Sequence, residues 1–212
     1  MASFKTIKCG SICQMVILVL ALVAGAAILT VGLVMNSKYS PKGQQQPLVI
    51  RLNSFRVSDL NVSNSVSGAN WDATLLFGNR HQVFEISIQT FETFVCYNHQ
   101  DALSCALVEP LHLGPKKQKL VHISFNATGC GGGEQPFIED IVLKQIKRDG
   151  DNGTLHVGLM LHLQVTFKKG PWSWVYELNP LCSGLDVRFM SGAGVGMITG
   201  DDPRPCSVPL LH

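Results

Sequence analysis

The sequence lacks a surplus of charge of either sign after residue 35. Lys5 and Lys8 are the only charged residues before Asn36, so 15 of the 17 basic side chains stand against all 15 acidic side chains in the remainder. A nucleic-acid-binding domain or a polybasic lipid-binding domain normally carries a surplus of basic residues. The balanced charge therefore argues against both classes, and we expect no nucleic-acid partner.

Sequence motifs for catalysis are also missing. The chain contains no Gly-x-Ser-x-Gly segment, which would expose a serine nucleophile. The glycine-rich residues 130–134 (CGGGE) lack the Gly-Lys-Ser/Thr ending that binds a triphosphate, and residues 192–196 open no helical pattern as a dinucleotide-binding loop would. We therefore expect a protein that is not an enzyme, with no catalytic residues and no cofactor.

The spacing of the seven histidines predicts no metal site. His156 and His162 share the polar face of a predicted strand, but six residues of strand span about 20 Å at roughly 3.3 Å per residue. One metal ion cannot bind both. His112 and His122 could approach other histidines only through tertiary contacts that the sequence does not reveal, so we expect no metal ligands.

The sequence does contain one long apolar run, from Met15 to Met35 (MVILVLALVAGAAILTVGLVM), without a single charge. As a helix these 21 residues would reach about 31 Å, close to the hydrocarbon thickness of a bilayer. The run predicts a transmembrane helix that acts as an uncleaved signal anchor. One alternative is a cleaved signal peptide, although its apolar region is usually about 7–15 residues long. The other is a buried helix of a soluble protein.

Flanking charges do not decide the orientation of this helix, because Lys5 and Lys8 precede it while Lys38, Lys42 and Arg51 follow it. Beyond the helix, acceptor sites for N-glycosylation occur in stretches that we predict to be loops, at Asn61, Asn126 and Asn152. These sites favour a cytosolic N-terminus and an extracellular C-terminal domain.

The seven cysteines fall on both sides of the apolar run. Cys9 and Cys13 lie beside its N-terminal end, where reversible palmitoylation is common; the alternative is two unmodified thiols. If residues 98–101 form the turn of a hairpin, Cys96 and Cys105 lie opposite each other, which permits a disulfide in an extracellular domain. The alternative is two buried thiols, and we predict no pairing for the remaining cysteines.

From Leu48 onward apolar and polar residues alternate, which is typical of strands with one buried face. In the clearest case, from Leu155 to Phe167, every odd-numbered residue is apolar. Similar alternation occurs over residues 48–52, 73–77, 84–88, 121–125 and 185–189. Six or seven strands predict a mainly β protein whose domain is a β-sandwich.

Two segments stand out from the strand pattern. After Pro136 the apolar residues have helical spacing and Gly150 follows, which predicts a short amphipathic helix with Phe137, Ile138, Ile141, Val142 and Ile146 on its apolar face. Trp172, Trp174 and Tyr176 share one face of a strand and form a candidate binding surface, because exposed aromatics favour interfaces. The alternative is that one or two of them cover the core of the sandwich.

These patterns divide the chain into five parts. We expect a cytosolic tail over residues 1–14, a transmembrane helix over 15–35, a polar tether over 36–47, the β-sandwich over 48–189 and a disordered tail over 190–212. The cytosolic tail is too short to fold into a domain. Any signal must therefore pass through partner proteins or through clustering in the membrane.

The order of these features resembles the plant NDR/HIN-like (NHL) proteins, whose outer part is a late-embryogenesis-abundant group-two (LEA-2) domain. The resemblance covers about residues 5–189 and rests on WDATLLFGNRHQVFEISI, on FVCYNHQDALSCALVEPLHLGPKKQKLVHISF, and on LHLQVTFKKGPWSW followed by LCSGLDVRF. Two family motifs differ: the Asn-Pro-Asn turn reads Gly78-Asn79-Arg80 here, and the proline-phenylalanine loop reads Pro110-Leu111-His112.

The resemblance implies a seven-stranded sandwich of the fibronectin-III or immunoglobulin-like type, residence in the plasma membrane, and a role in plant defence, in wall-to-membrane adhesion or in water stress. It implies no enzyme. We therefore expect a single-pass protein whose outer sandwich binds an unidentified protein or cell-wall partner, and a homo-oligomer is compatible with this expectation. The main alternative is a stress-protection or lipid-binding module, which a large apolar cavity between the sheets would favour. A secreted hydrolase would need acid and base residues clustered in a cleft.

Overall fold

The computed structural model describes residues 9–39, 46–60, 62–63, 66–67, 69–98, 101–125, 138–189, 195–198 and 203–209. The chain divides into two compact units, residues 1–40 and 41–212, and each is described by itself. One long N-terminal helix precedes a β-rich domain that also contains a short helix. This arrangement confirms the expected fold class.

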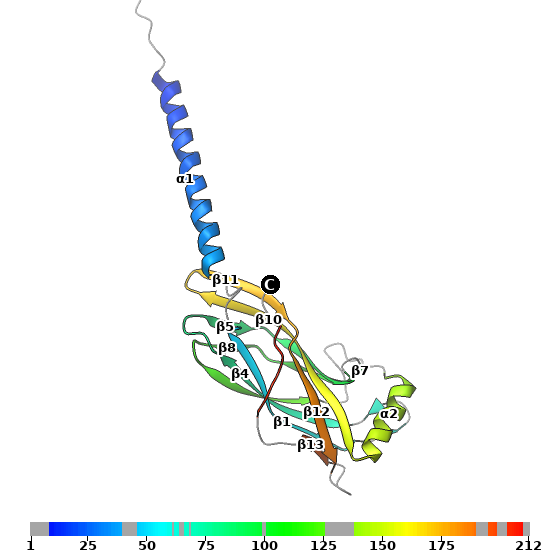
Figure 1. Cartoon of the computed structure of the whole chain (residues 1–212). Coiled ribbons are helices and arrows are strands. Elements are labelled where there is room, and N and C mark those ends of the chain that lie inside the picture. Colours follow the sequence, from blue (N-terminus) through cyan, green and yellow to red (C-terminus); the bar gives the residue numbers. More distant parts are fainter. Residues whose placement is uncertain are drawn as a thin grey trace, which may run out of the picture. The chain divides into compact units, whose positions relative to one another are not determined.

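The first unit consists of helix α1, Cys9–Tyr39 (Figure 1). Its segment Gln14–Val34 has a mean hydropathy of 2.8, and none of that segment is buried. The helix is therefore long and apolar enough to cross a membrane. It continues to Tyr39, so residues 36–39 are helical rather than part of the expected tether.

The second unit contains the short helix α2, Asp140–Asp151, and strands β1 to β14. In chain order the strands are β1 Leu48–Ser58, β2 Val62–Ser63, β3 Val66–Ser67, β4 Asn70–Asn79, β5 Glu85–Ile88, β6 Phe91–Tyr97, β7 Asp101–Val108, β8 Leu111–Leu113, β9 Gln118–Phe125, β10 Thr154–Lys169, β11 Trp172–Leu178, β12 Leu181–Phe189, β13 Val195–Ile198 and β14 Arg204–Pro205. Each of the six predicted strand segments lies within or largely within one of them.

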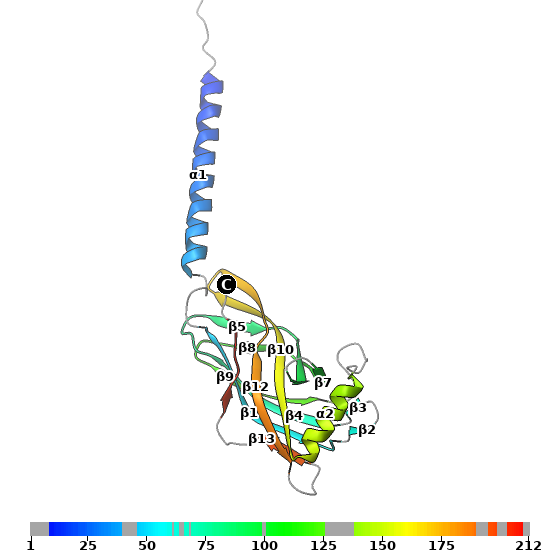
Figure 2. The same ribbon diagram turned by 45° about the vertical axis from the view of Figure 1, so that its right-hand side comes forward.

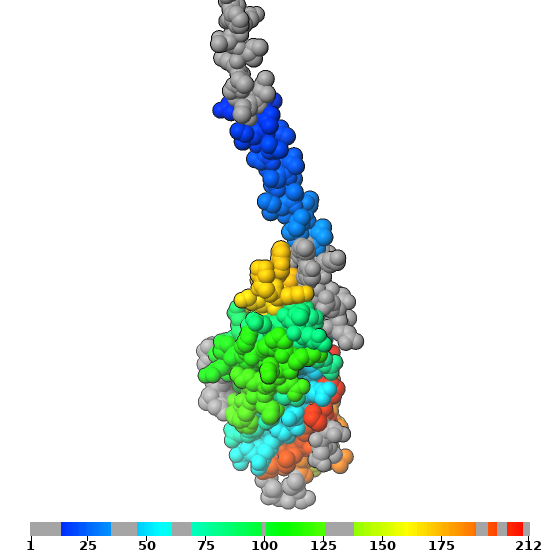
Figure 3. Space-filling view, turned by 90° about the vertical axis from the view of Figure 1, so that its left-hand side faces the viewer, coloured from blue at the N-terminus to red at the C-terminus, as the bar shows by residue number. Residues whose placement is uncertain are grey.

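Strand β10 joins the two layers of the domain, because its two halves pair with different neighbours. The first half pairs with β6 and β12, and the second half pairs with β5 and β11. The main path of the sheet runs β7-β6-β10-β12-β13-β1-β4-β9 and curls into a sandwich with a barrel-like form (Figures 1 and 2). In the space-filling view, the green strands, which include β7 and β9 at the two opposite ends of this path, form the centre of one face (Figure 3).

The core fills the space between the layers, and the alternation along β10 shows how. Leu155, Val157, Leu159, Leu161, Leu163, Val165 and Phe167 are each at most 3% exposed. They pack with large aromatic side chains from the other layer, among them Phe55, Trp71 and Phe77. Full burial of one such side chain stabilises the fold by roughly 1.5–3 kcal/mol.

Helix α2 overlaps the segment that helical spacing predicted, but it begins at Asp140 and includes Gly150, which was expected to follow it, and one residue of the predicted apolar face is exposed. Val142, Leu143 and Ile146 are buried, whereas Ile141 is 61% exposed. The helix packs beside β10 (Figure 2). The Tyr97 hydroxyl on β6 donates a 2.7 Å hydrogen bond to Asp149 Oδ2. The expected place of Ile141 on the apolar face is therefore wrong, because Leu143 takes that place.

The expectation of a disordered tail is wrong for the described residues after 190. Strand β13 lies between β12 and β1, and β14 pairs with β1. A disulfide between Cys182 and Cys206 links β12 to the residue that follows β14. The tail is ordered here because it supplies strands that complete the sheet, so the domain extends beyond residue 189.

Candidate binding site

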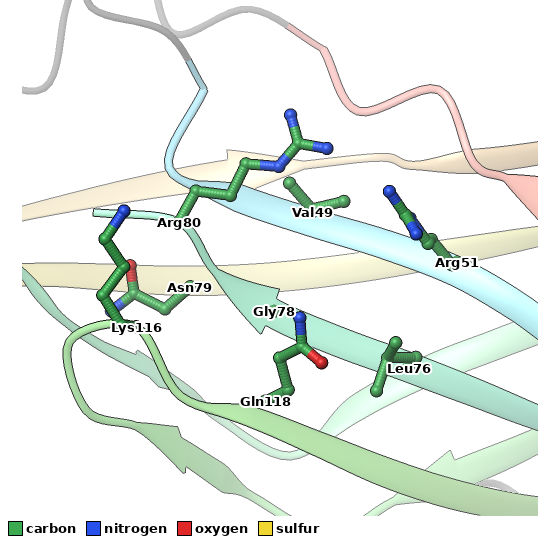
Figure 4. Close-up of a pocket in the computed structure, with 8 residues that line it drawn as sticks. All are labelled: Val49, Arg51, Leu76, Gly78, Asn79, Arg80, Lys116 and Gln118. Carbon is green, nitrogen blue, oxygen red and sulfur yellow. The ribbon is translucent and has the colours of Figure 1, made fainter. Parts of the chain in front are cut away.

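A surface hollow of about 200 Å³ lies on the outward face of strands β1, β4 and β9. Antiparallel pairing places Val49 beside Gly78, and Gly78 beside Gln118. Three segments that are distant in sequence therefore meet at this place. We call it the cationic hollow, and its lining consists of Val49, Arg51, Leu76, Gly78, Asn79, Arg80, Lys116 and Gln118 (Figure 4).

The hollow exists because the residue in the middle of this row has no side chain. A Cβ atom added at Gly78 would lie 3.5 Å from Gln118 Cγ and 3.8 Å from the Val49 carbonyl oxygen. Both are ordinary van der Waals distances. The Cβ atom of an alanine at Gly78 would therefore fit without a clash.

Asn79 fixes the backbone behind the hollow. Its side chain is buried, and Nδ2 lies 2.7, 3.0 and 3.3 Å from the carbonyl oxygens of Phe84, Gly114 and Leu113. Its Oδ1 accepts a 3.0 Å hydrogen bond from the His81 N–H. Buried polar groups that are satisfied in this way hold their surroundings in one arrangement. Asn79 thus fastens the loop after β4 to the turn before β9.

The two cationic residues on these loops are held by their own backbones. The Arg80 N–H donates to the Pro47 carbonyl at 2.8 Å, and the Lys116 N–H donates to the His81 carbonyl at 3.0 Å. Lys116 also has a positive φ of 57°, which fixes the direction of its turn. The backbone that carries both side chains is therefore held in place, while both residues are exposed.

The charges around the hollow are of one sign. The side chains of Arg51 and Arg80 extend to the same side of β1, with Val49 between them (Figure 4). In the part of the chain that the structure describes, no carboxylate lies within 4.0 Å of the charged nitrogens of Arg51, Arg80 or Lys116. The lining offers guanidinium, ammonium and amide donors, which suit an anion.

The neighbouring His81 imidazole is affected by burial and by two lysine charges. Burial lowers the pKa of His81 from its ordinary value of 6.5, and the positive charges of Lys169 and Lys116 lower it further. Its Nδ1 accepts hydrogen bonds from the N–H groups of Val83 and Phe84 at 3.2 and 3.3 Å. Both effects keep this imidazole neutral.

The aromatic strand proposed as a binding surface is β11, and two of its three rings pack against the core. The ring centroid of Trp174 lies 5.9 Å from that of Phe84, and Tyr176 lies 5.8 Å from Phe167. Trp172 is half-buried at the start of the strand. Trp174 and Tyr176 therefore cover the core, as the alternative interpretation of these aromatics expected.

The structure disperses the histidines. His156 Nδ1 lies 2.7 Å from Asp186 Oδ1, and His122 Nε2 lies 3.6 Å from Asp72 Oδ1. His162 lies further along β10 from His156. Within the described ranges, no three His, Cys, Asp or Glu side chains are grouped as metal ligands.

The predicted Cys96–Cys105 disulfide is wrong. Cys96 is a free, buried thiol, and Cys105 is disulfide-bonded to another cysteine. A register shift after Val95 places Cys105 opposite Phe94 and Cys96 opposite Ala102, so the two sulfurs are not partners across the hairpin. Desolvation, assisted by the charge of Asp101, raises the pKa of Cys96 to about 11, which makes it unreactive at neutral pH.

The remaining candidate residues are placed only in part. Asn152 is exposed in the turn between α2 and β10, which is a sterically open place for a glycan. Asn61 and Asn126 lie outside the described residues, as do residues 130–134. Cys9 and Cys13 belong to the first turns of α1.

Sequence reasoning missed the cationic hollow and the Cys182–Cys206 bond. The hollow draws its charges from three segments, and only their pairing brings Arg51, Arg80 and Lys116 together. Two local signals were available: the small residue before Asn79, and the pair of lysines just before β9. Neither signal shows that the two segments are neighbours.

Comparisons with known proteins found little similarity. No family model matches the chain, and no curated protein matches it significantly. Two solved chains match. A crystal structure of a protein from Archaeoglobus fulgidus is 12% identical and covers 66% of this chain and 98% of its own, with a TM-score of 0.31.

Proposed function

We propose that this chain is a single-pass membrane protein whose β-sandwich is a non-enzymatic binding or adhesion domain of the NHL/LEA-2 type. The observation that carries the proposal is the apolar surface of α1. Leu22 and Ile28 on this helix are 69% and 73% exposed within the chain itself. Burial of apolar surface is worth roughly 25 cal/mol per Å², and a bilayer would bury all sides of such a helix.

The disulfides support an orientation with the sandwich outside the cytosol. Cys182 is bonded to Cys206, and Cys105 is also disulfide-bonded. Such bonds persist in oxidising compartments and are rare in the cytosol. Together with the exposed acceptor residue Asn152, they favour a plasma-membrane protein with a cytosolic N-terminus.

Surface recognition is favoured over a lipid-binding cavity. The inward side chains of β10, such as Leu159, Leu161 and Val165, are 0% exposed, so in the described part the space between the layers is filled. The cationic hollow, by contrast, opens on the outer face. The biological setting, namely defence, wall adhesion or water stress, follows from the family resemblance alone.

The test is to map the topology of the full-length chain in plant cells. Alkaline carbonate extraction should leave the protein in the membrane, and glycosidase should shift its mobility by less after Asn152→Gln. Asn179→Gln is a matched control, because Asn179 precedes proline and lies in no acceptor site. A sandwich that is unglycosylated, and that protease digests from the cytosolic side of intact membranes, would refute the orientation.

A further inference from the structure

Strand β11 is an edge of the sheet, and it lies beyond β10 at the margin of the domain (Figure 1). It pairs with β10 on one side and has no second neighbour among the described residues. An open edge presents a row of free N–H and C=O groups, which proteins usually protect with lysines, prolines, bulges or shortness. β11 is seven residues long, contains neither Lys nor Pro, and pairs with β10 without a register shift. Its exposed side therefore lacks the usual protection against another strand.

The other edges of the sheet are protected. β7 carries an extra residue, Leu103, where its pairing with β6 shifts register. β8 is only three residues long, and β9 carries Lys119 near its start. This contrast singles out β11 as the edge that is built to accept a partner.

The hairpin between β10 and β11 determines which backbone groups are free. Gly170 and Pro171 form a two-residue loop between Lys169 and Trp172, and Gly170 has the positive φ, 56°, that a type II′ turn requires. The turn bond makes Lys169 and Trp172 a hydrogen-bonded pair, and such pairs alternate with non-bonded pairs along the hairpin. The residues whose N–H and C=O groups point away from β10 are therefore Ser173, Val175 and Glu177.

We propose that two copies of this chain pair through their β11 edges as antiparallel strands, with a twofold axis at Val175. In this register Ser173 lies opposite Glu177 of the partner subunit, and each outward N–H of one copy meets an outward C=O of the other. A shift of two residues would leave one outward residue of each copy unpaired. A contact that uses the same surface on both copies closes as a dimer.

The exposed side chains around β11 are complementary in the same register. Side chains directly opposite each other on adjacent strands share one face. Lys168 lies opposite Ser173 within the hairpin, so only this small serine separates Lys168 from the partner's Glu177. Thr166 lies opposite Val175, which is 58% exposed, so β-branched side chains from both copies form the central row. No like charges face each other directly.

The aromatic face of β11 fits this arrangement as well. Trp174 lies opposite Tyr176 of the partner subunit, and both residues are half-buried against their own core. Aromatic pairs across neighbouring strands are among the favourable ones. One strand per copy covers less area than a permanent interface does, so we expect a reversible dimer that dissociates on dilution. The contact uses only the β-rich domain and does not depend on whether α1 spans a membrane.

The first test is oxidative cross-linking of the full-length chain in detergent. Its background carries Cys9→Ser and Cys13→Ser, which remove the thiols of α1. In this background Val175→Cys should form a disulfide-linked dimer, because opposed Cα atoms lie about 5.5 Å apart, within the range of a disulfide. Ser173→Cys is the matched control and should stay monomeric, since the two copies of residue 173 lie about 13 Å apart along the strands. Equal cross-linking of the two variants, or none with Val175→Cys, would overturn the proposal.

The second test measures the dimer dissociation constant by sedimentation equilibrium in density-matched detergent. Val175→Pro removes an outward N–H but keeps the hydrogen bonds to β10, so the constant should rise by at least about tenfold. Val175→Thr keeps both the N–H and the branched side chain, and it should dimerise as the wild type does. A Val175→Pro chain that dimerises like the wild type would show that α1 or another surface joins the copies. A wild type that is monomeric at every concentration would also contradict the inference.

An exchange of charge tests the register without altering the backbone. Glu177→Lys would bring two cations together across Ser173 and should raise the dissociation constant by roughly threefold. Lys168→Glu combined with Glu177→Lys should restore it, because opposite charges then meet again between the copies. Within one chain these two residues are not opposite each other, so the rescue reports on contact between copies. If the double variant is as weak as Glu177→Lys alone, the register is wrong.

Discussion

At the scale of single residues, this domain depends on positions where a small or polar residue has a specific task. Asn79 satisfies four backbone groups inside the domain, and Gly78 beside it leaves the hollow open. Gly196 has the opposite surroundings, because neighbouring side chains already occupy the space around it. These differences make the effects of substitution predictable.

Gly196→Ala is expected to destabilise the domain by about 1–3 kcal/mol, the usual effect of overpacking. The new Cβ would lie 2.6 Å from Val187 Cγ1 and 2.9 Å from atoms of Val57 and Phe189. Gly78→Ala is the matched control, since its nearest contact is 3.5 Å, and its stability should change by less than about 1 kcal/mol. Urea unfolding of the detergent-solubilised chain measures both. Equal stability of the two variants would contradict the packing of β13 between β1 and β12.

The stability of the domain should fall as the pH drops below about 6.5, in part through His81. Because the folded-state pKa of His81 lies below 6.5, the unfolded chain binds more protons in this range, so acid favours unfolding. Protonation of Nδ1 would also displace the hydrogen bonds from Val83 and Phe84. His81→Asn keeps a short acceptor but does not titrate, so its melting temperature should decline less steeply with acid. Parallel pH curves for the two proteins would exclude His81 as a contributor.

At the scale of elements, the sequence predicted most of the fold because one physical signal dominates. Period-two alternation marks β10 over its whole length, since a strand with one buried face must place every second side chain inward. The errors arise where another effect decides. The register shift after Val95 moves Cys105 away from Cys96, and no local pattern marks it. The short β13 follows the small residues 191–194 (SGAG) and reads as part of a loop, yet it fits between its neighbours because Gly196 has no side chain.

The Cys182–Cys206 bond should stabilise the C-terminal element more than the rest of the domain. It closes a loop with a sequence separation of 24, for which a loss of about 2–4 kcal/mol is typical on removal. In the Cys182→Ser, Cys206→Ser variant, the amides of Cys206 and Ser207 should exchange faster, because their bonds to Ile50 and Leu181 are no longer clamped. Cys96→Ala is the control for loss of a buried sulfur. Unchanged exchange at Ser207 would show that strand pairing alone holds this segment.

At the scale of the whole molecule, composition and arrangement carry different information. The balanced charge after residue 35 correctly describes the average, but it hides the local cluster of Arg51, Arg80 and Lys116. Only the pairing of β1, β4 and β9 creates that cluster. The apolar run is the reverse case: its length and composition are properties of one continuous segment, so the sequence alone predicts α1.

The anchoring of the molecule should fail when charge enters the middle of α1. Val23→Arg with Ala26→Arg places two cations near the centre of the span, where each costs about 2.5–3.5 kcal/mol of insertion free energy. The variant should therefore be released by alkaline carbonate and should lose the glycan shift that depends on Asn152. Val23→Leu with Ala26→Leu keeps the helix apolar and should behave as the wild type does. A span with two central charges would need partners that shield them in order to stay inserted. If the arginine variant nevertheless remains in the membrane fraction and keeps its glycan, the apolar surface of α1 is not what holds this chain in the bilayer.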